Sequence, residues 1–264
     1  MTKSNQALPL ISIITPVFNA EKYLAETIKS VQAQTHSDYE HLLVIDANSE
    51  DESVVIALRE QSKDHRIRTI QNPKALGAAA NRNIGIDFSR GEYLAFLDAD
   101  DTWPADKLEK QLRFSQEKKA PFTFTAFRRM SEDGSKLSPQ TIAPASAGYY
   151  DLLKLNVIAL HTVLLKRDFV GDHRFPSVVH EDFAFWLELL RPRNGQQELK
   201  ALGLNEPLAF YRSVQGSRAF DKKKAAHWRW KILRDYEKLP LWKAVYYFGE
   251  YALRATLLHQ KTKV

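Results

Sequence analysis

The sequence contains 264 residues, of which 44% are hydrophobic and 27% are charged, with 10 glycines and 11 prolines. This composition allows a sizeable core and excludes a collagen-like, linker-rich or intrinsically disordered chain. No apolar run approaches the ~18 residues of a membrane span, and the first residues predict no secretory signal. Because cysteine is absent, disulfides, thiolate zinc sites and a cysteine nucleophile are excluded, and a cytoplasmic location is expected.

The positive charge is concentrated at the C-terminus. The chain has a formal net charge of +6, yet residues 222–264 alone carry 11 Lys or Arg and 3 Asp or Glu, a net charge of +8. Three of the five tryptophans lie in the same segment. A nearly neutral body therefore carries a basic, aromatic tail, which is a composition suited to an anionic surface.

Strands and helices are expected to alternate through the first 125 residues. Apolar runs predict buried strands, and apolar residues at helical spacing between them predict helices. This order favours a doubly wound, mainly parallel α/β sheet. The expected strands are 10–14, 41–45, 66–70 and 93–97. The first expected helix follows a cap at Asn19 and carries Leu24, Ile28 and Val31, and the second follows a capping box at Ser49 and Glu52 and carries Val55 and Leu58. The third covers residues 76–86, and the fourth follows Pro104 and carries Leu108 and Leu112.

The second half of the chain follows a different rhythm. It predicts strands over 122–129 and 158–165, an edge strand over 207–211, and helices over 149–155 and 181–190. The tail predicts two helices, 222–238 and 241–259, separated at Pro240. We therefore expect a domain over residues 1–220 and a helical appendage over 221–264.

Four carboxylates follow two of the predicted strands. Asp46 ends one strand, and Asp98, Asp100 and Asp101 follow another. Parallel strands present their carboxyl ends at one edge of a sheet, where open α/β folds bind ligands. Asp98 and Asp100 are spaced to hold a divalent cation, Mn²⁺ or Mg²⁺, whereas Asp101 is expected to cap the next helix.

Five segments in order resemble the family 2 glycosyltransferases, which are inverting enzymes of the GT-A fold, a Rossmann-like α/β architecture. The resemblance spans residues 9–218. It rests on residues 13–19 (IITPVFN), 44–49 (VIDANS), 77–85 (GAAANRNIG), 96–101 (FLDADD) and 180–182 (HED).

The resemblance implies a role for each matching position. A nucleotide sugar, most simply a UDP-sugar, would be the donor, and a carboxylate would act as general base on the acceptor hydroxyl. The implied roles are base contact for Thr15 and Asp46, nucleotide contact for Arg82, loop support for Asn83, ribose contact for Asp98, metal binding for Asp100 with Asp98, and catalysis for Asp182 in the pair that it forms with Glu181.

Several positions depart from the family pattern or keep two interpretations. Asn81 stands where the family has Ala, and Val214 stands at a frequent His, so that Arg212, Ser217 or Arg218 is a candidate for phosphate contact instead. Trp103 is expected either to stack on a sugar or to pack under the following helix.

Other functions are weighed beside the transferase. The segment LAFLDADDT (94–102) resembles the nucleophile loop of haloacid dehalogenase-like phosphohydrolases, with Asp98 as nucleophile. A nucleotidyltransferase is disfavoured because no glycine-rich loop follows the first strand. A non-catalytic basic binding module is disfavoured because the acidic rim repels phosphate, and no nucleic-acid partner is expected.

The acceptor and the tail are also matters of prediction. The resemblance implies a cell-envelope glycan or a lipid-linked acceptor. The tail is expected to pack on the body, to form a homodimer interface, or to contact a membrane surface as a peripheral anchor at the inner face of the cell membrane.

Overall fold

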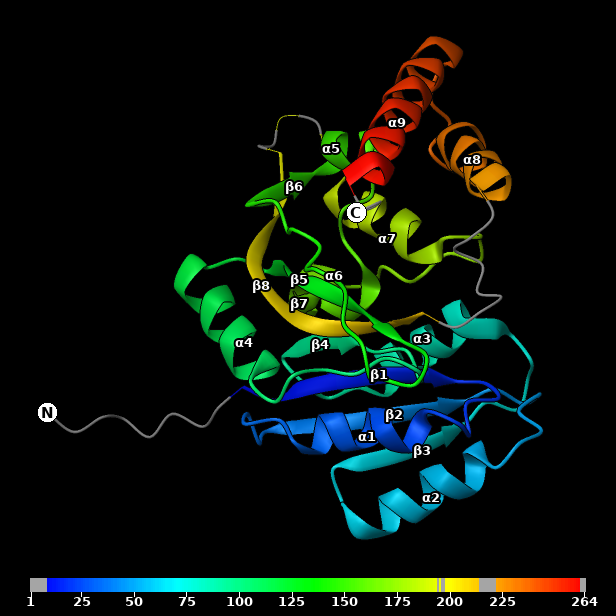
Figure 1. Cartoon of the computed structure of the whole chain (residues 1–264), viewed down its shortest axis with the longest axis vertical. Coiled ribbons are helices and arrows are strands. Elements are labelled where there is room, and N and C mark those ends of the chain that lie inside the picture. Colours follow the sequence, from blue (N-terminus) through cyan, green and yellow to red (C-terminus); the bar gives the residue numbers. More distant parts are fainter. Residues whose placement is uncertain (1–8, 194, 196–197, 214–221, 262–264) are drawn as a thin grey trace, which may run out of the picture.

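The computed structural model describes residues 9–193, 195, 198–213 and 222–261, and is built around one eight-stranded sheet (Figure 1). The strand order is β3-β2-β1-β4-β7-β5-β8-β6. The strands are β1 (Ile11–Val17), β2 (Tyr39–Ile45), β3 (Ile67–Gln71), β4 (Tyr93–Phe96), β5 (Phe122–Ser131), β6 (Ser146–Gly148), β7 (Leu164–Lys166) and β8 (Lys200–Ser213).

Helices flank this sheet and continue beyond it at the C-terminus. They are α1 (Leu24–Gln32), α2 (Ser53–Lys63), α3 (Gly77–Phe88), α4 (Lys107–Lys118), α5 (Tyr149–Lys154), α6 (Arg167–Val170), α7 (Glu181–Leu190), α8 (Lys222–Lys231) and α9 (Leu241–Lys261), with a 3₁₀ turn over Leu160–Thr162 and a π-helix over Ile232–Tyr236. In Figure 1 the helices α8 and α9 lie at the top, next to α5 and α7.

The first half of the sheet is parallel, as the sequence predicts. Strands β3, β2, β1 and β4 pair in parallel, while β7 is inserted antiparallel between β4 and β5. Successive side chains of a strand point to opposite faces, so the neighbours Ile13 and Ile14 belong to different hydrophobic clusters. Both faces are covered, which explains why the strands are continuous apolar runs.

The strand predicted over 207–211 is confirmed as part of a longer strand, β8. Strand β6 pairs only with residues 200–202 of β8, so residues 207–211 pair with β5 on one side and make an isolated bridge from Phe210 to Thr102. Pro207 lacks a backbone N–H, and it lies where the pairing register of β5 with β8 shifts next to Ala126. The irregular pairing therefore accommodates the proline without ending the strand.

Three local predictions need correction. Residues 158–165 form the 3₁₀ turn and only the start of β7, because the chain turns before it joins the sheet. Val55 and Leu58 are exposed on α2, which instead packs through Ala57. Asn19 does not cap α1; it has a φ of 45° and its side chain accepts a hydrogen bond from the Glu50 N–H.

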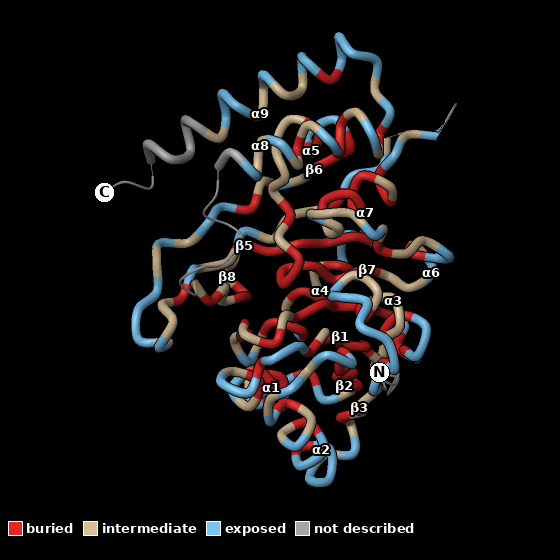
Figure 2. Tube along the Cα trace, turned by 90° about the vertical axis from the view of Figure 1, so that its right-hand side faces the viewer, coloured by how far each residue is buried: buried red, intermediate tan, exposed pale blue. Residues whose placement is uncertain are grey.

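The described part of the tail shares the main hydrophobic core. Ile232, Leu233 and Ala244 belong to the cluster that also contains Leu152 and Trp186. Figure 2 shows buried segments continuing from the sheet into α7, while much of α9 is exposed. The expected boundary between residues 220 and 221 falls within 214–221, a segment outside the described residues.

Candidate functional site

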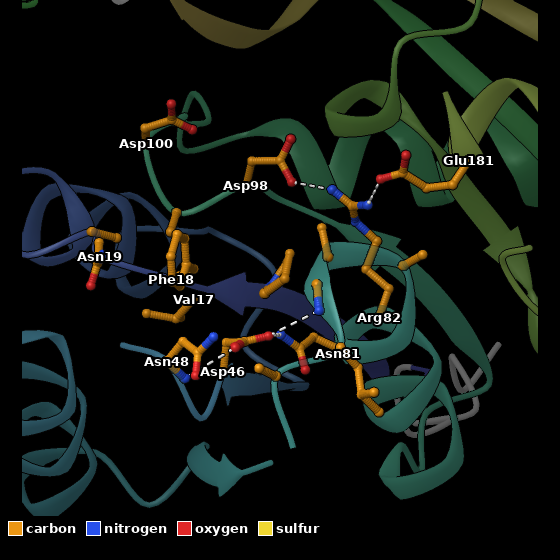
Figure 3. Close-up of a pocket in the computed structure, with 18 of the residues that line it drawn as sticks. Val17, Phe18, Asn19, Asp46, Asn48, Asn81, Arg82, Asp98, Asp100 and Glu181 are labelled. Carbon is orange, nitrogen blue, oxygen red and sulfur yellow. Dashed lines mark hydrogen bonds and ion pairs between the residues drawn. The ribbon is translucent and has the colours of Figure 1, made fainter. Parts of the chain in front are cut away.

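A cavity of about 900 Å³ opens at the carboxyl ends of β1, β2 and β4 (Figure 3). Its walls come from five parts of the chain: the loop after β1, the loop after β2, the start of α3, the acidic loop after β4, and the segment that leads into α7. The lining residues include Phe18, Asn19, Asp46, Asn48, Leu76, Gly77, Asn81, Arg82, Asp98, Asp100, Ser177, Val178, Val179 and Glu181.

Asp46 is held on the cavity wall by three donors. Its carboxylate accepts hydrogen bonds from the Asn81 side-chain amide (2.9 Å), the Gly77 N–H (3.1 Å) and the Asn48 N–H (3.2 Å). Burial alone would raise the pKa of Asp46, but the hydrogen bonds from these neighbours outweigh it and lower that pKa. Asp46 therefore presents a fixed anionic acceptor to the cavity.

Asn81 supports Asp46 from α3. Its side-chain oxygen accepts a hydrogen bond of 2.7 Å from the Asn72 amide, which fixes its own amide toward Asp46. The sequence marks this position only as a departure from the family's alanine. An Asn within an alanine-rich helix that is expected to pack closely was the available signal, since an amide that becomes buried needs partners.

Arg82 joins two carboxylates across the cavity. Its guanidinium lies 2.6 Å from Asp98 Oδ1 and 2.7 Å from Glu181 Oε1, and its side chain is only 5% exposed. Figure 3 shows Arg82 rising from α3 between the acidic loop and α7. Residues 82, 98 and 181 are thus brought together by tertiary structure although they lie far apart in sequence.

Asp100 lines the cavity near a second carboxylate, that of Asp98. Burial and the nearby charge of Asp98 raise the pKa of Asp100 to about 6, although Arg212 opposes this. Among the described residues, no group of three or more His, Cys, Asp or Glu side chains forms a metal-binding cluster. Two carboxylates, Asp98 and Asp100, line the cavity, and carboxylate oxygens are donors that suit a hard divalent cation.

Asp101 does not cap a helix, contrary to the prediction. It is fully buried, and its carboxylate accepts a hydrogen bond of 2.8 Å from the Arg212 N–H and lies 3.3 Å from His161 Nδ1. The Thr27 hydroxyl donates to the carbonyl oxygens of both Ala99 and Asp101. The acidic loop is therefore fixed from beneath, because Asp101 is drawn into the core by these partners.

Arg212 fixes the same loop and is not among the cavity-lining residues. Its guanidinium donates to the carbonyl oxygens of Asp100 (2.8 Å) and Glu132 (2.7 Å), and it forms an ion pair with Glu26. The predicted alternatives Ser217 and Arg218 lie outside the described residues. Arg212 thus acts on the cavity by holding the backbone of Asp100.

Two more predicted contacts point away from the cavity. Thr15 is buried, and its hydroxyl pairs with His41 Nε2 at 2.9 Å inside the sheet, while the following residues Pro16 and Val17 line the cavity. Trp103 is 3% exposed and donates from its indole nitrogen to the His161 carbonyl oxygen. Of its two interpretations, the structure shows the packed one.

The pair Glu181-Asp182 begins α7 beside the cavity. Glu181 lines the cavity, whereas Asp182 is half-buried and is not among the lining residues. Burial and the charge of Glu181 raise the pKa of Asp182, against the effect of Arg82 and His180. His180, with a φ of 60°, turns the chain from the cavity wall into this helix; such left-handed residues cluster at functional sites.

Comparison with known proteins identifies relatives of the whole chain. The model of glycosyl transferase family 2 matches residues 12–174. A Bacillus subtilis protein whose name assigns it to glycosyl transfer in teichuronic acid biosynthesis, TuaG, is 38% identical over 94% of this chain and 96% of its own. An Escherichia coli UDP-Glc:α-D-GlcNAc-diphosphoundecaprenol β-1,3-glucosyltransferase, WfgD, is 33% identical over 92% of each chain.

Solved structures share the fold at lower identity. A fragment of Staphylococcus aureus TarS in complex with UDP-GlcNAc superposes with a TM-score of 0.67 at 17% identity, covering 92% of this chain and 71% of that one. The chain spans 42% of the longer TarS structure. The mannosyltransferase PcManGT of Pyrobaculum calidifontis, in complex with GDP-Man and Mn²⁺, gives a TM-score of 0.65 at 16% identity, covering 87% and 65%.

These findings decide between the interpretations that the sequence left open. The sequence match and the shared fold confirm the resemblance and the GT-A architecture, and they set aside the phosphohydrolase, the nucleotidyltransferase and the binding module.

Proposed function

The chain belongs to glycosyl transferase family 2, and from this premise we propose that it transfers a sugar from a UDP-sugar, with inversion, to a hydroxyl of a lipid-linked cell-envelope glycan. One observation carries the proposal. A single cavity collects Asp46, Arg82, Asp98, Asp100 and Glu181 at the carboxyl ends of parallel strands, where α/β folds bind nucleotides. The relative WfgD is named for UDP-Glc and a lipid-linked acceptor.

We propose that the uracil base of the UDP-sugar binds at the Asp46 end of the cavity. An ionised carboxylate accepts hydrogen bonds only, and the imide N–H of uracil is a donor. Phe18 and Leu76, which are 58% and 54% exposed, provide apolar surface on the same cavity, as a flat base requires. We assign Asp98 to the ribose side and Arg82 to the nucleotide.

A divalent cation is proposed to bind at Asp100 and Asp98. Both carboxylates line the cavity, and carboxylate oxygens are ligands that Mn²⁺ and Mg²⁺ prefer. Burial, and after it the charge of Asp98, raises the pKa of Asp100, and a bound cation would offset that effect. Such an ion would supply positive charge to the diphosphate leaving group. In this chain, the Arg212 guanidinium donates a hydrogen bond to the Asp100 carbonyl oxygen, and this bond fixes the loop that presents the two carboxylates.

We propose Asp182 as the general base. In an inverting displacement, the acceptor oxygen bonds to the anomeric carbon while the bond from that carbon to the diphosphate oxygen breaks, and the hydroxyl proton passes to a carboxylate. Glu181 is already engaged by Arg82 at 2.7 Å. Burial and the charge of Glu181 raise the pKa of Asp182, which favours proton uptake by this carboxylate.

Thermal unfolding tests donor and metal binding directly. UDP with Mn²⁺ is expected to raise the Tm of the full chain, and Asp100→Ala is expected to remove that rise because it deletes a ligand of the cation. Asp172→Ala, at an exposed acidic position outside the cavity, serves as the control and should keep the full shift. A UDP-dependent Tm shift that survives Asp100→Ala would contradict the metal assignment.

The tail is proposed to contact a membrane surface. Within the described residues, no helix is both long and apolar enough to cross a bilayer. The inner side of α9 packs into the core through Ala244, while Leu241, Trp242, Val245, Tyr246 and Leu253 are exposed. Exposed aromatic residues in a basic segment suit the interface of an anionic membrane, where a lipid-linked acceptor resides.

A further inference from the structure

A second groove, of about 370 Å³, opens next to the cavity of the proposed donor site. The two spaces share Ser177, Val178 and Val179, which form a wall between them. This wall leads through His180 directly into Glu181 and Asp182. A ligand in the groove therefore lies beside both the donor cavity and the residue that we propose as the base.

The opposite side of the groove belongs to the C-terminal segment. It is formed by the end of α8 and by the π-helix, with Trp228, Lys231, Ile232, Asp235 and Tyr236 as its residues. Trp228 is partly exposed, and Lys231 Nζ lies 5.0 Å from the centre of its ring. An aromatic face, an ammonium group and a carboxylate thus line one space.

This side of the groove is rigidly supported. The Tyr236 hydroxyl donates to Glu188 of α7 at 2.7 Å, and Arg229 donates to the carbonyl oxygens of Leu152 and Leu153. Ile232 is buried in the core. A π-helical turn is uncommon and is frequently found at functional sites. Binding groups on such a preorganised frame lose little freedom when a ligand binds.

We propose that this groove is the acceptor subsite and that it takes the glycosyl diphosphate end of a carrier-linked glycan. The inference rests on the proposed function. The sugar ring packs on Trp228, because the C–H groups of a pyranose face suit an aromatic surface, and Asp235 accepts hydrogen bonds from hydroxyls. Lys231 pairs with phosphate. The shared wall then allows an acceptor hydroxyl to reach the donor sugar.

Calorimetric titration of the full chain, saturated with UDP and Mn²⁺, tests the assignment. The probe is N-acetylglucosamine α-linked through a diphosphate to a short alkyl chain. Trp228→Ala is expected to raise the Kd of the probe at least tenfold and Lys231→Gln several-fold, while Trp228→Phe keeps most of the affinity. The UDP affinity of each variant should stay within twofold of wild type, which also shows that the variants fold.

The controls separate this inference from the proposed function. Trp242→Ala, at a 71% exposed tryptophan on α9, should leave the Kd unchanged, and the alkyl diphosphate without its sugar should bind at least tenfold more weakly. Three results would overturn the acceptor subsite alone. They are equal binding of the sugar probe by Trp228→Ala and Trp242→Ala, equal binding of the two probes by the wild type, and no binding of the sugar probe to the UDP-loaded wild type. Failure of wild type to bind UDP would overturn the proposed function, and the acceptor subsite with it.

Discussion

Arg82 and Asp46 show how single residues organise the cavity. Arg82 lies between Asp98 and Glu181 with its side chain almost fully buried, so its charge stays uncompensated only when both carboxylates are removed. Asp46 is kept ionised by donors from one loop and from helix α3. The charges of the cavity walls are thus set before a substrate enters.

Asp182→Asn is expected to lower kcat by ~10²- to 10⁴-fold, because an amide cannot take the proton from the hydroxyl of the acceptor sugar and general-base catalysis contributes about that factor. The affinity for UDP should stay within twofold of wild type. Turnover of a UDP-sugar and calorimetric UDP binding measure the two effects. Asp172→Asn is the matched control on an exposed carboxylate; a fully active Asp182→Asn enzyme would remove Asp182 from the mechanism.

Asn81→Ala is expected to weaken UDP binding several-fold, because Asp46 loses its side-chain donor while its two backbone donors remain. The Asn72 amide also loses its acceptor, so the free energy of unfolding should fall by about 1–3 kcal/mol. Urea unfolding and UDP titration measure these changes. Gln116→Ala, at an exposed amide side chain of α4, should change neither, and an unchanged UDP affinity for Asn81→Ala would argue against the contact between Asp46 and the nucleotide base.

Among the elements, α3 is the one on which the site depends most directly. It begins at the cavity with Gly77 and carries Asn81 and Arg82 toward the sheet. Gly85, one turn further on, lets the helix pack tightly on β1, since a Cβ there would lie 2.4 Å from Ile14 Cγ2. The position of the helix, and so of its polar residues, depends on this close contact.

Gly85→Ala is expected to lower the free energy of unfolding by about 1–3 kcal/mol, the usual cost of overpacking a core. In a chain that already carries Ile14→Ala, Gly85→Ala should lower the free energy of unfolding by less than it does in the wild type, because the smaller side chain makes room for the new methyl group. Urea unfolding of the four proteins of this double-mutant cycle measures the coupling.

Gly249→Ala provides the matched control on α9. A Cβ at this position meets nothing within 4 Å, so the substitution should stabilise the protein by about 0.5–1 kcal/mol through helix propensity alone. Destabilisation by Gly249→Ala comparable to that by Gly85→Ala would contradict the packing explanation.

At the scale of the whole molecule, the C-terminal helices complete the body and also present a separate surface. Ile232, Leu233 and Ala244 join the main core, whereas the far side of α9 stays exposed above it (Figure 2). Helices α8 and α9, which belong to the basic C-terminal segment, lie at the end opposite to α2 in Figure 1. The molecule thus has a polar cavity and, apart from it, a basic aromatic face.

Replacement of Trp242, Val245 and Tyr246 by Ser is expected to reduce sedimentation with phosphatidylglycerol vesicles at least tenfold, because these side chains supply the apolar contact. Binding of the wild type should fall with added salt and should be weak on phosphatidylcholine. Val55→Ser with Leu58→Ser, at exposed apolar residues of α2, is the control. Unchanged vesicle binding would refute the membrane contact, and a wild-type dimer that the triple variant loses would assign the face to a homodimer.

The sequence by itself determined the α/β class, the family and the acidic loop, because these depend on local runs and motifs: continuous apolar strands, residues 96–101 and the pair at 181–182. Only the tertiary structure decided which of these side chains face the cavity. Thr15 and Trp103 turn into the core, Asp101 and Arg212 fix the acidic loop, and Asn81 supports Asp46. The reason is physical: a buried polar group takes whichever partner lies within hydrogen-bonding distance, and here those partners lie far away along the chain.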